Sequence, residues 1–334
     1  MPTGEGTAVV AAARAGDEAA FGALAERYRP ELQVHCYRML GSLEDAEDVV
    51  QETFLRAWRR RRTFEGRSTF RAWLYGIATN ASLDVVASKR RRVRAAAGEG
   101  MASEVPWLQP YPDRLLPAVA PSEDEPDHAL VSKETIELAF LVAIQHLPPT
   151  QRAVLIVRDV LGWSAKETAV LLETSVPAVN SALQRARATL RTRLPASRAE
   201  WAPGSDPSES ERALLQRYMD ATERDDLDGL AEVIGQDARF SMPPEPGVWI
   251  GRDAMIASWV EGGFGTEEFG RIRCLATRAN MQPAVANYLR RPGEPDYRPM
   301  ALDVLRIADG LVEEIVTFPP RAFAAFGLPP AIPG

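Results

Sequence analysis

The sequence predicts a multidomain chain in which two all-α units precede an α+β domain. Apolar residues recur at helical spacing, i, i+3, i+4 and i+7, through most of the first 194 residues. An acidic, proline-rich stretch at residues 95–132 divides this helical part. Strand-like segments and a tight-turn dipeptide occupy the last third. A length of 334 residues fits two or three such domains.

The composition is that of a soluble globular protein, with 46% hydrophobic and 25% charged residues. The net charge of −7 conceals a basic excess near residues 54–94 and 185–198. No apolar run approaches the ~20 residues that span a bilayer, so we expect a cytoplasmic protein with no membrane partner. The two cysteines and three histidines are scattered, so no disulfide framework, metal site or cofactor is expected.

The first unit, residues 10–94, is predicted to be a helical bundle. A helix pair broken at Pro30 comes first. A second amphipathic helix follows, with Ser42 as its N-cap and Asp45 in its first turn. A third helix is expected from Ser68 to near Ser88.

A strongly basic segment lies between Phe54 and Arg94, with twelve Lys or Arg against two acids. Cations neutralise phosphates and aromatic faces stack on unpaired bases, so basic helices that also carry Phe64, Phe70, Trp73 and Tyr75 suit nucleic acid. The alternative is that the aromatic rings are core and the arginines a solvated rim. For Phe70, Trp73 and Leu74 the core alternative is favoured, because they lie on the apolar stripe.

Residues 95–132 are predicted to be a linker, because they hold seven acids, six prolines and one base. Five apolar residues are unusual for a pure spacer. We expect them to dock on a neighbouring domain or, as the alternative, in a groove of a partner. They are Trp107, Leu108, Tyr111, Leu115 and Leu116.

Residues 133–195 form the second helical unit. Ser164 and Glu167 make a capping box before one short helix, and Ser175 is the N-cap of the next. The outer face of that last helix is polar and basic. This pattern favours a helix-turn-helix whose second helix enters a DNA major groove.

Several segments resemble the extracytoplasmic-function (ECF) sigma factors of RNA polymerase. DAEDVVQETFLRAW at 45–58 and FRAWLYGIATN at 70–80 are similar to sigma region 2. The segments 147–154 and 175–187 are similar to sigma region 4. The resemblance implies that the chain binds core RNA polymerase, through its β′ clamp and β flap, and promoter DNA. An anti-sigma factor is a further partner that the resemblance raises.

The resemblance also assigns residues. Contact with core polymerase is implied for Asp45, Asp48, Gln51, Glu52 and Arg56. Contact with the −10 element is implied for Arg67, Arg71, Asn80, Lys89, Arg90, Arg91 and Arg92. Contact with the −35 element is implied for Ser175, Val179, Asn180, Ser181, Gln184, Arg185 and Arg187. Glu173 stands where the family usually has Gly, and Asn180-Ser181-Ala182 replaces a more basic tripeptide, so the −35 sequence stays open.

After a linker at 196–207, residues 208–318 read as helices followed by a curved antiparallel sheet, with Asp309-Gly310 as a hairpin turn. This domain is similar to SnoaL-like domains of the NTF2-like superfamily, through DARFSMPP at 237–244, Trp249 and Gly251-Arg252. With this third domain, the chain resembles sigma factors of the sigma-G type. Residues 319–334 are expected to be a tail that docks on another domain.

A cone-shaped sheet encloses a pocket, and candidate lining residues are Asp237, Arg239, Trp249, Tyr288 and Asp303. The domain has no histidine, and the sequence identifies no partner for its carboxylates, so we expect no catalysis. The predicted function is a sigma factor whose third domain modulates its activity. The alternative is a DNA-tethered small-molecule sensor or SnoaL-type enzyme.

Overall fold

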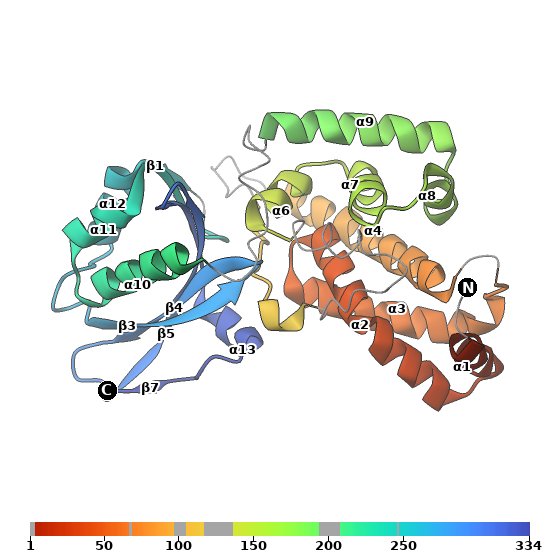
Figure 1. The fold of residues 1–334 in the computed structure, drawn as a ribbon, viewed down its shortest axis with the longest axis horizontal. Coiled ribbons are helices and arrows are strands. Elements are labelled where there is room, and N and C mark those ends of the chain that lie inside the picture. The colour runs from red at the N-terminus through yellow and green to blue at the C-terminus, as the bar shows by residue number, and fades with distance from the viewer. Residues whose placement is uncertain (1–3, 67–68, 97–104, 117–135, 194–207, 246) are drawn as a thin grey trace. The chain divides into compact units, whose positions relative to one another are not determined.

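The computed structural model describes residues 4–66, 69–96, 105–116, 136–193, 208–245 and 247–334. The chain divides into two compact units (Figure 1). Unit 1 comprises Met1–Gly98 and Leu115–Ala196, and unit 2 comprises Glu99–Arg114 and Ser197–Gly334. The segment before Leu115, which the sequence predicts as linker, therefore belongs by its contacts to the C-terminal unit.

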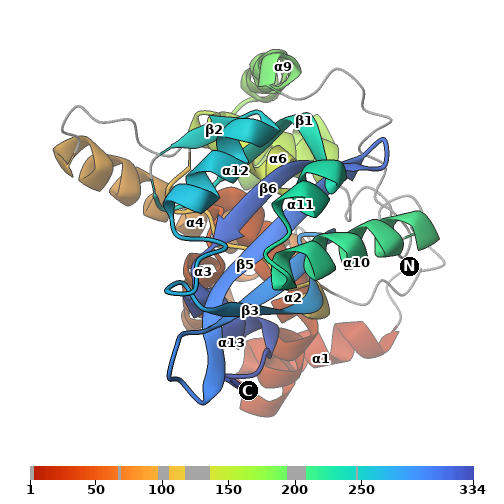
Figure 2. The ribbon, with the colours of Figure 1, turned by 90° about the vertical axis from the view of Figure 1, so that its left-hand side faces the viewer.

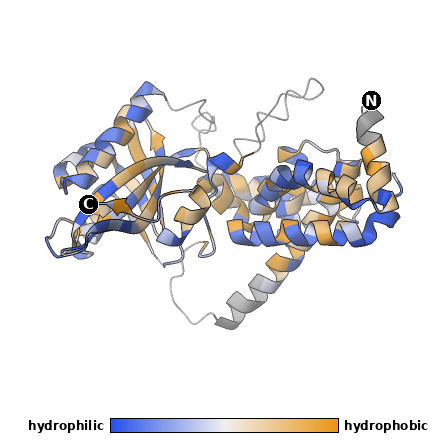
Figure 3. Cartoon of the chain, turned by 90° about the horizontal axis from the view of Figure 1, so that it is seen from below, coloured by the Kyte–Doolittle hydropathy of each residue, from blue (hydrophilic) through white to orange (hydrophobic). Residues whose placement is uncertain are grey.

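The first part of unit 1 contains α1 (Gly4–Ala15), α2 (Glu18–Leu40), α3 (Leu43–Arg60), the 3₁₀ turn η1 (Arg61–Thr63) and α4 (Phe70–Ala96). Along these helices hydrophilic and hydrophobic residues alternate, as expected of amphipathic helices (Figure 3). Side chains from α2, α3 and α4 fill the core between them, and Leu32, Ala46, Val50 and Leu74 are each at most 1% exposed.

The predicted cap of α3 is confirmed, since the Ser42 hydroxyl accepts a hydrogen bond from the Asp45 amide at 3.2 Å. The predicted break at Pro30 is wrong. Pro30 lies inside α2, and the chain turns instead at Gly16, which has a φ of 106°, before Asp17 caps α2. A proline within a helix removes one backbone hydrogen bond. The helix can continue through it when the turns before and after the proline are packed against neighbouring helices, as the buried residues of α2 on either side of Pro30 are.

The predicted limits of the third helix are also revised. Ser68 lies outside the described residues, and the Thr69 hydroxyl accepts a hydrogen bond from the Ala72 amide at 3.1 Å, as an N-cap does. The helix continues past Ser88 to Ala96. Arginine and alanine favour helix, so the basic run extends α4 instead of ending it.

The second part of unit 1 contains α6 (Leu138–Gln145), α7 (Pro149–Leu155), the π-helical turn η3 (Ile156–Val160), α8 (Ala165–Leu171) and α9 (Val176–Arg193). Both predicted caps are confirmed. Ser164 and Glu167 form a capping box, and the Ser175 hydroxyl accepts from the Ala178 amide at 3.3 Å. Two helices joined by a tight turn result, as the helix-turn-helix prediction requires.

The turn between α8 and α9 places Glu173 in the left-handed region, with a φ of 50°. A side chain there costs about 1 kcal/mol relative to glycine, because Cβ crowds the backbone. We therefore expect Glu173→Gly to raise the free energy of unfolding by about 0.5–1 kcal/mol, measured by urea denaturation. Glu173→Ala keeps the Cβ and should give no such gain; an equal gain in both variants would show that the backbone conformation is not the cause.

Arg152 of α7 joins the two parts of unit 1. Its guanidinium is 2% exposed and donates to the carbonyl of Met39 in α2 at 2.5 Å. It also donates to the side-chain and main-chain oxygens of Gln145, at 2.5 and 2.6 Å. The Gln145 amide in turn donates to the Arg38 carbonyl at 3.1 Å. These bonds occupy carbonyls at the C-terminal end of α2, which has no further helical turn to satisfy them.

Unit 2 contains α10 (Glu209–Glu223), α11 (Leu227–Val233), β1 (Ile234–Ser241), β2 (Val248–Ile250), α12 (Arg252–Glu261), β3 (Arg271–Ala279), β4 (Gln282–Arg290), β5 (Asp296–Ala308), β6 (Leu311–Phe318), η5 (Pro320–Ala322), α13 (Phe323–Phe326) and β7 (Ile332–Pro333). The strand order is β2-β1-β6-β5-β4-β3, and β7 pairs with β5. Only β1 and β6 pair in parallel among these strands. The curved sheet carries α10, α11 and α12 on one face (Figure 2).

The Asp309-Gly310 turn is confirmed, with φ values of 50° and 74°, as a tight hairpin requires. The predicted destination of residues 319–334 is wrong. The tail packs on its own sheet, where Ile332 pairs with Tyr297 and the Tyr288 hydroxyl donates to the Pro329 carbonyl at 2.9 Å. An unpaired edge segment of β5 and the apolar Phe323 ring explain why the tail returns to this unit.

Candidate functional site

One face of α3 combines polar groups with an exposed apolar residue. Asp48 and Gln51 are exposed, and Asp45 is half-buried. Leu55, in the same helical row, is 45% exposed, although it is a large hydrophobic residue. An apolar centre within an acidic rim is typical of a protein-binding surface. Sequence reasoning missed Leu55, whose position on the outer face of the helical pattern was the available signal.

Two other predicted polymerase contacts on α3 are engaged with each other. Arg56 Nε donates to Glu52 Oε1 at 2.7 Å, and Arg56 Nη1 lies 3.4 Å from Asp84 Oδ2 on α4. The hydrogen bond to Glu52 raises the pKa of Arg56. Glu52 and Arg56 are therefore held by each other at one edge of the α3 face. Asp48 and Gln51 are exposed on the same face.

The predicted −10 contacts on α4 are only partly accessible. Asn80 is exposed and projects from the helix to solvent. Arg71 is held by Glu31 at 2.7 Å, and its guanidinium lies over the Tyr75 ring. Arg67 lies outside the described residues, and for Lys89, Arg90, Arg91 and Arg92 the structure describes the helical backbone alone. Among these residues, Asn80 has the position expected of a base-reading side chain.

The aromatic residues near α4 are core rather than stacking platforms. Phe64, Phe70 and Trp73 pack together with ring centroids 5.3–5.6 Å apart. Phe70, Leu74 and Tyr75 are buried, which confirms the core alternative for the first two. Phe64, Phe70 and Tyr75 are therefore core residues, whereas Trp73 is half-buried.

The outer face of α9 presents a polar and basic row. Asn180, Ser181, Gln184 and Arg185 are all exposed. Arg187 is exposed but forms a bidentate ion pair with Asp159, at 2.6 and 2.9 Å. Val179 is completely buried, so the prediction that it contacts DNA is wrong: it anchors α9 against its neighbours. The exposed residues among the predicted −35 contacts are therefore Ser175, just before α9, and Asn180, Ser181, Gln184, Arg185 and Arg187 on it.

Residues 105–114 dock on unit 2, which decides between the two alternatives for Leu108 and Tyr111. Both are buried, with 3% and 0% of their surface exposed. The Tyr111 amide donates to Asn280 Oδ1 at 2.8 Å, and the Asn280 amide donates to the Tyr111 carbonyl at 2.9 Å. Asn280 occupies the tight β3–β4 turn with a φ of 56°, so this turn is the docking site.

A carboxylate completes that docking. Asp113 Oδ1 accepts from the Met281 amide at 2.8 Å, and Asp113 Oδ2 accepts from Arg278 Nε at 3.0 Å. Burial raises the pKa of Asp113, and the two hydrogen bonds act against that rise. Arg114 adds a bond to the Ala325 carbonyl at 2.5 Å. The segment is therefore fastened at both the β3–β4 turn and α13.

Asp113→Ala is expected to release this segment, because it removes a hydrogen bond and an ion pair. The Asp113 side chain that makes them is only 15% exposed. The expected loss of local stability is about 1.5–3 kcal/mol. Hydrogen exchange at the Tyr111 and Met281 amides should become about tenfold faster or more. Asp253→Ala is the control, since Asp253 is 94% exposed; unchanged exchange in the Asp113 variant would contradict the fastening.

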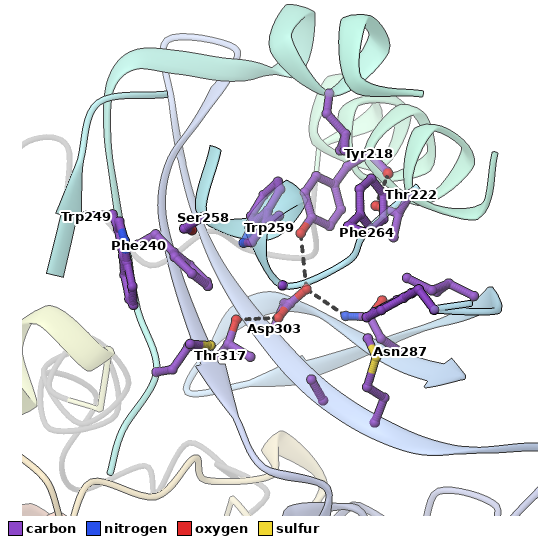
Figure 4. Close-up of a pocket in the computed structure, with 17 residues that line it drawn as sticks. Tyr218, Thr222, Phe240, Trp249, Ser258, Trp259, Phe264, Asn287, Asp303 and Thr317 are labelled. Atoms are coloured by element: carbon purple, nitrogen blue, oxygen red, sulfur yellow. Dashed lines mark hydrogen bonds between the residues drawn. The ribbon is translucent and has the colours of Figure 1, made fainter. Parts of the chain in front are cut away.

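Unit 2 also encloses a cavity of about 310 Å³ between the sheet and α10–α12, partly open to solvent (Figure 4). Most of its wall is apolar, built from aromatic rings and methionines. Phe240 is 5.2 Å from Trp249 and 5.5 Å from Trp259, measured between ring centroids. The aromatic lining residues are Tyr218, Phe240, Trp249, Trp259, Phe264 and Phe269.

The polar end of the cavity is centred on Asp303 of β5. Asp303 Oδ2 accepts from the Tyr218 hydroxyl at 3.1 Å and from Asn287 Nδ2 at 2.6 Å. Asp303 Oδ1 accepts from the Thr317 hydroxyl at 2.5 Å. Burial raises the pKa of Asp303, while these three hydrogen bonds lower it. The four side chains come from α10, β4, β5 and β6, and converge as Figure 4 shows.

Two of the five predicted pocket residues, Trp249 and Asp303, line this cavity. The other three do not line it. Asp237 is exposed, and Arg239 forms an ion pair with Glu314 at 3.8 Å on the outer side of β1. Tyr288 packs on Phe323, because alternate residues of β4 point to opposite faces. Tyr218, Asn287 and Thr317 were missed, because their convergence depends on strand register.

The part of the chain that the structure describes also bears on metal binding and membrane insertion. In that part of the chain, no group of three or more His, Cys, Asp or Glu side chains is arranged to hold a metal ion. Among the helices described, none combines the length and hydropathy of a membrane span. Cys36 and Cys274 are both buried and free.

Comparison with known families finds three matching models along the chain. Sigma-70 region 2 matches residues 24–92, and Sigma-70 region 4 matches residues 137–190. A SnoaL-like domain matches residues 215–315. The three matches follow the order of the N-terminal helices, the helix-turn-helix and the curved sheet.

Full-length relatives extend this result. The chain is 41% identical over 330 residues to the ECF RNA polymerase sigma factor SigG of Mycobacterium tuberculosis, covering 96% of this chain and 86% of that protein. It is 31% identical over 183 residues to the ECF RNA polymerase sigma factor SigW of Bacillus subtilis, covering 54% of this chain and 91% of SigW.

A solved structure shares the fold. The crystal structure of the Mycobacterium tuberculosis extracytoplasmic function sigma factor SigJ aligns with a TM-score of 0.58 and 22% identity, over 91% of this chain and 98% of SigJ. Identity and coverage along nearly the whole of SigG carry the family assignment, and the three matched domains agree with it. The chain belongs to the ECF RNA polymerase sigma factors and carries a SnoaL-like domain after the two sigma domains.

Proposed function

We propose that this chain recruits core RNA polymerase to promoters through the α3 face and reads the −10 and −35 elements through α4 and α9. The observation behind the proposal is that a member of the sigma factor family presents two exposed surfaces in one chain. One is the acidic and apolar face of α3, and the other is the basic outer face of α9. The acidic-apolar face suits a basic protein surface, and the basic helix suits duplex DNA. A protein with both can link a polymerase to a DNA site.

At the −10 element the proposed reader is Asn80. Transcription starts on melted DNA, so a base that leaves the stack needs a polar group that reads its edge. Asn80 is exposed on α4, and an amide can both donate to and accept from a base. The basic run at residues 89–92 supplies phosphate attraction further along the same helix.

At the −35 element the proposed readers are on α9. Gln184 can pair bidentately with adenine and Arg185 with guanine, and both are exposed. Asn180 and Ser181 lie one turn earlier on the same face. Arg187 is less free, because Asp159 already occupies its guanidinium, so its proposed role is to contact phosphate at the edge of the groove.

The third domain is proposed to modulate initiation by holding the segment between the two sigma domains. Residues 105–114 lie between them in sequence and dock on unit 2 through Tyr111 and Asp113. Docking takes residues 105–114 out of the connection between the two sigma domains and so shortens the sequence that links them. We propose no catalysis for this domain, since three donors engage the Asp303 carboxylate and restrict it as a proton acceptor. A cytoplasmic location follows from the proposed polymerase partner.

The test is transcription in vitro from a pool of templates with randomised upstream sequence. Core RNA polymerase with the full chain is expected to yield transcripts whose templates share two short elements at a fixed spacing. Core polymerase alone should select no such elements. A pool that stays random with the full chain would reject the proposal, and substitution of Arg185 by Ala should relax selection in the upstream element alone.

A further inference from the structure

The cavity lies in unit 2, whereas the helices proposed to contact polymerase and promoter, α3, α4 and α9, belong to unit 1. Its size, about 310 Å³, is at the lower end of the range for small-molecule sites. Six aromatic side chains line it, and they come from α10, β1, β2, α12 and the α12–β3 loop. The ring surface that faces the cavity is apolar. A ligand that covers this surface gains the free energy of removing it from water.

The polar end supplies a directional contact. A carboxylate has about four acceptor positions, and Tyr218, Asn287 and Thr317 fill three of them on Asp303. One position remains on Oδ1, which receives the Thr317 hydroxyl alone among these donors. A ligand hydroxyl or N–H group that reaches Asp303 can fill it. Three fixed donors also hold the Asp303 side chain in place before any ligand arrives, so the site is preorganised.

The charge of the lining restricts the ligand further. The described lining residues include no Lys, Arg or His, so an anion would meet Asp303 without a compensating cation. A cation would lose its hydration in a largely apolar wall, while the carboxylate is already hydrogen-bonded three times. Burial raises the pKa of Asp303, and its three hydrogen bonds act against that rise.

We propose that this cavity is a binding site for an uncharged, largely apolar small molecule that donates one hydrogen bond to Asp303. The apolar body of the ligand contacts Phe240, Trp249 and Trp259. Its hydroxyl or N–H group points to the Asp303, Tyr218 and Thr317 end. The chain is then a sigma factor with a built-in receptor site, and the proposal does not depend on the promoter or polymerase contacts.

The test is fluorescence titration of the full chain with N-phenyl-1-naphthylamine, an uncharged, two-part aromatic amine that becomes bright in apolar surroundings. We expect saturable 1:1 binding with a Kd of roughly 10–100 µM. This range follows from the binding free energy per non-hydrogen atom that is typical of ligands of this size. Ser258 lines the cavity from α12, so Ser258→Phe should fill it and weaken binding more than tenfold. Ala257 is exposed on the same helix, and Ala257→Phe should leave the Kd within twofold.

Two analogues of the probe test the chemistry without any change to the protein. N-methylation removes the N–H donor, and it should weaken binding several-fold if Asp303 accepts that hydrogen. 1-Anilino-8-naphthalenesulfonate adds an anion to the same skeleton, and it should bind at least tenfold more weakly. Absent binding, equal binding by both phenylalanine variants, or tighter binding of either analogue would overturn the proposal. Thermal melting of Ser258→Phe shows whether the variant is folded with a filled cavity or has lost its fold. The two analogues bind the unchanged protein, so they test the proposal even if this variant does not fold.

Discussion

Asp48→Arg is expected to lower the affinity of the chain for core RNA polymerase by at least about tenfold, and promoter-directed transcription with it. Asp48 is exposed at the centre of the α3 face, beside Gln51 and the 45% exposed Leu55. Reversal of its charge replaces attraction to a basic partner with repulsion. A loss of ~1.4 kcal/mol of interaction free energy lowers the affinity tenfold. The measurement is competition for core polymerase against a labelled reference sigma factor.

Asp253→Arg is the matched control for this reversal. Asp253 is also a highly exposed carboxylate on a helix, but it lies in the third domain. Its reversal should change the affinity for core polymerase by less than twofold. Equal losses in the two variants would mean that net charge, and not the α3 face, governs the interaction.

Arg152→Ala is expected to lower the free energy of unfolding of the chain by about 3–5 kcal/mol. The change removes a buried guanidinium and leaves the carbonyls of Met39 and Gln145 without a donor. Charged hydrogen bonds of this kind contribute about 1.5–3 kcal/mol each, and an orphaned buried carbonyl adds its desolvation cost. Urea denaturation followed by circular dichroism measures the loss.

Arg187→Ala is the control for the arginine at 152. The Arg187 side chain is 53% exposed, and its ion pair with Asp159 should contribute about 1 kcal/mol or less. A loss at Arg152 no larger than that at Arg187 would contradict the view that the Arg152 hydrogen bonds join the two helical parts of unit 1.

Local features of the fold were predictable from the sequence because local chemistry determines them. Ser42, Ser164 and Ser175 cap helices where the pattern placed them, since a short hydroxyl side chain reaches the free amides of a first turn. The Asp309-Gly310 turn tolerates positive φ for the same local reason. The break expected at Pro30 does not occur, because buried residues before and after it in α2 outweigh the helix-breaking preference of one proline.

Features that depend on long-range register were not predictable. Asp303 was identified as a pocket residue, but its partners Tyr218, Asn287 and Thr317 lie 14 to 85 positions away along the chain. The docking of Tyr111 on Asn280 joins residues 169 positions apart. Apolar content marked Leu108 and Tyr111 as buried, and no pattern in the sequence specified the β3–β4 turn as their partner.

We propose that this chain and core polymerase open promoter DNA together. Permanganate reactivity of thymines on a template selected in the transcription experiment tests it most directly, because permanganate attacks unpaired thymines. Reactive thymines are expected around the −10 element when both proteins are present, and their reactivity should be lost with Asn80→Ala or with either protein alone. Reactivity from the chain without polymerase, or undiminished reactivity in the Asn80 variant, would contradict it.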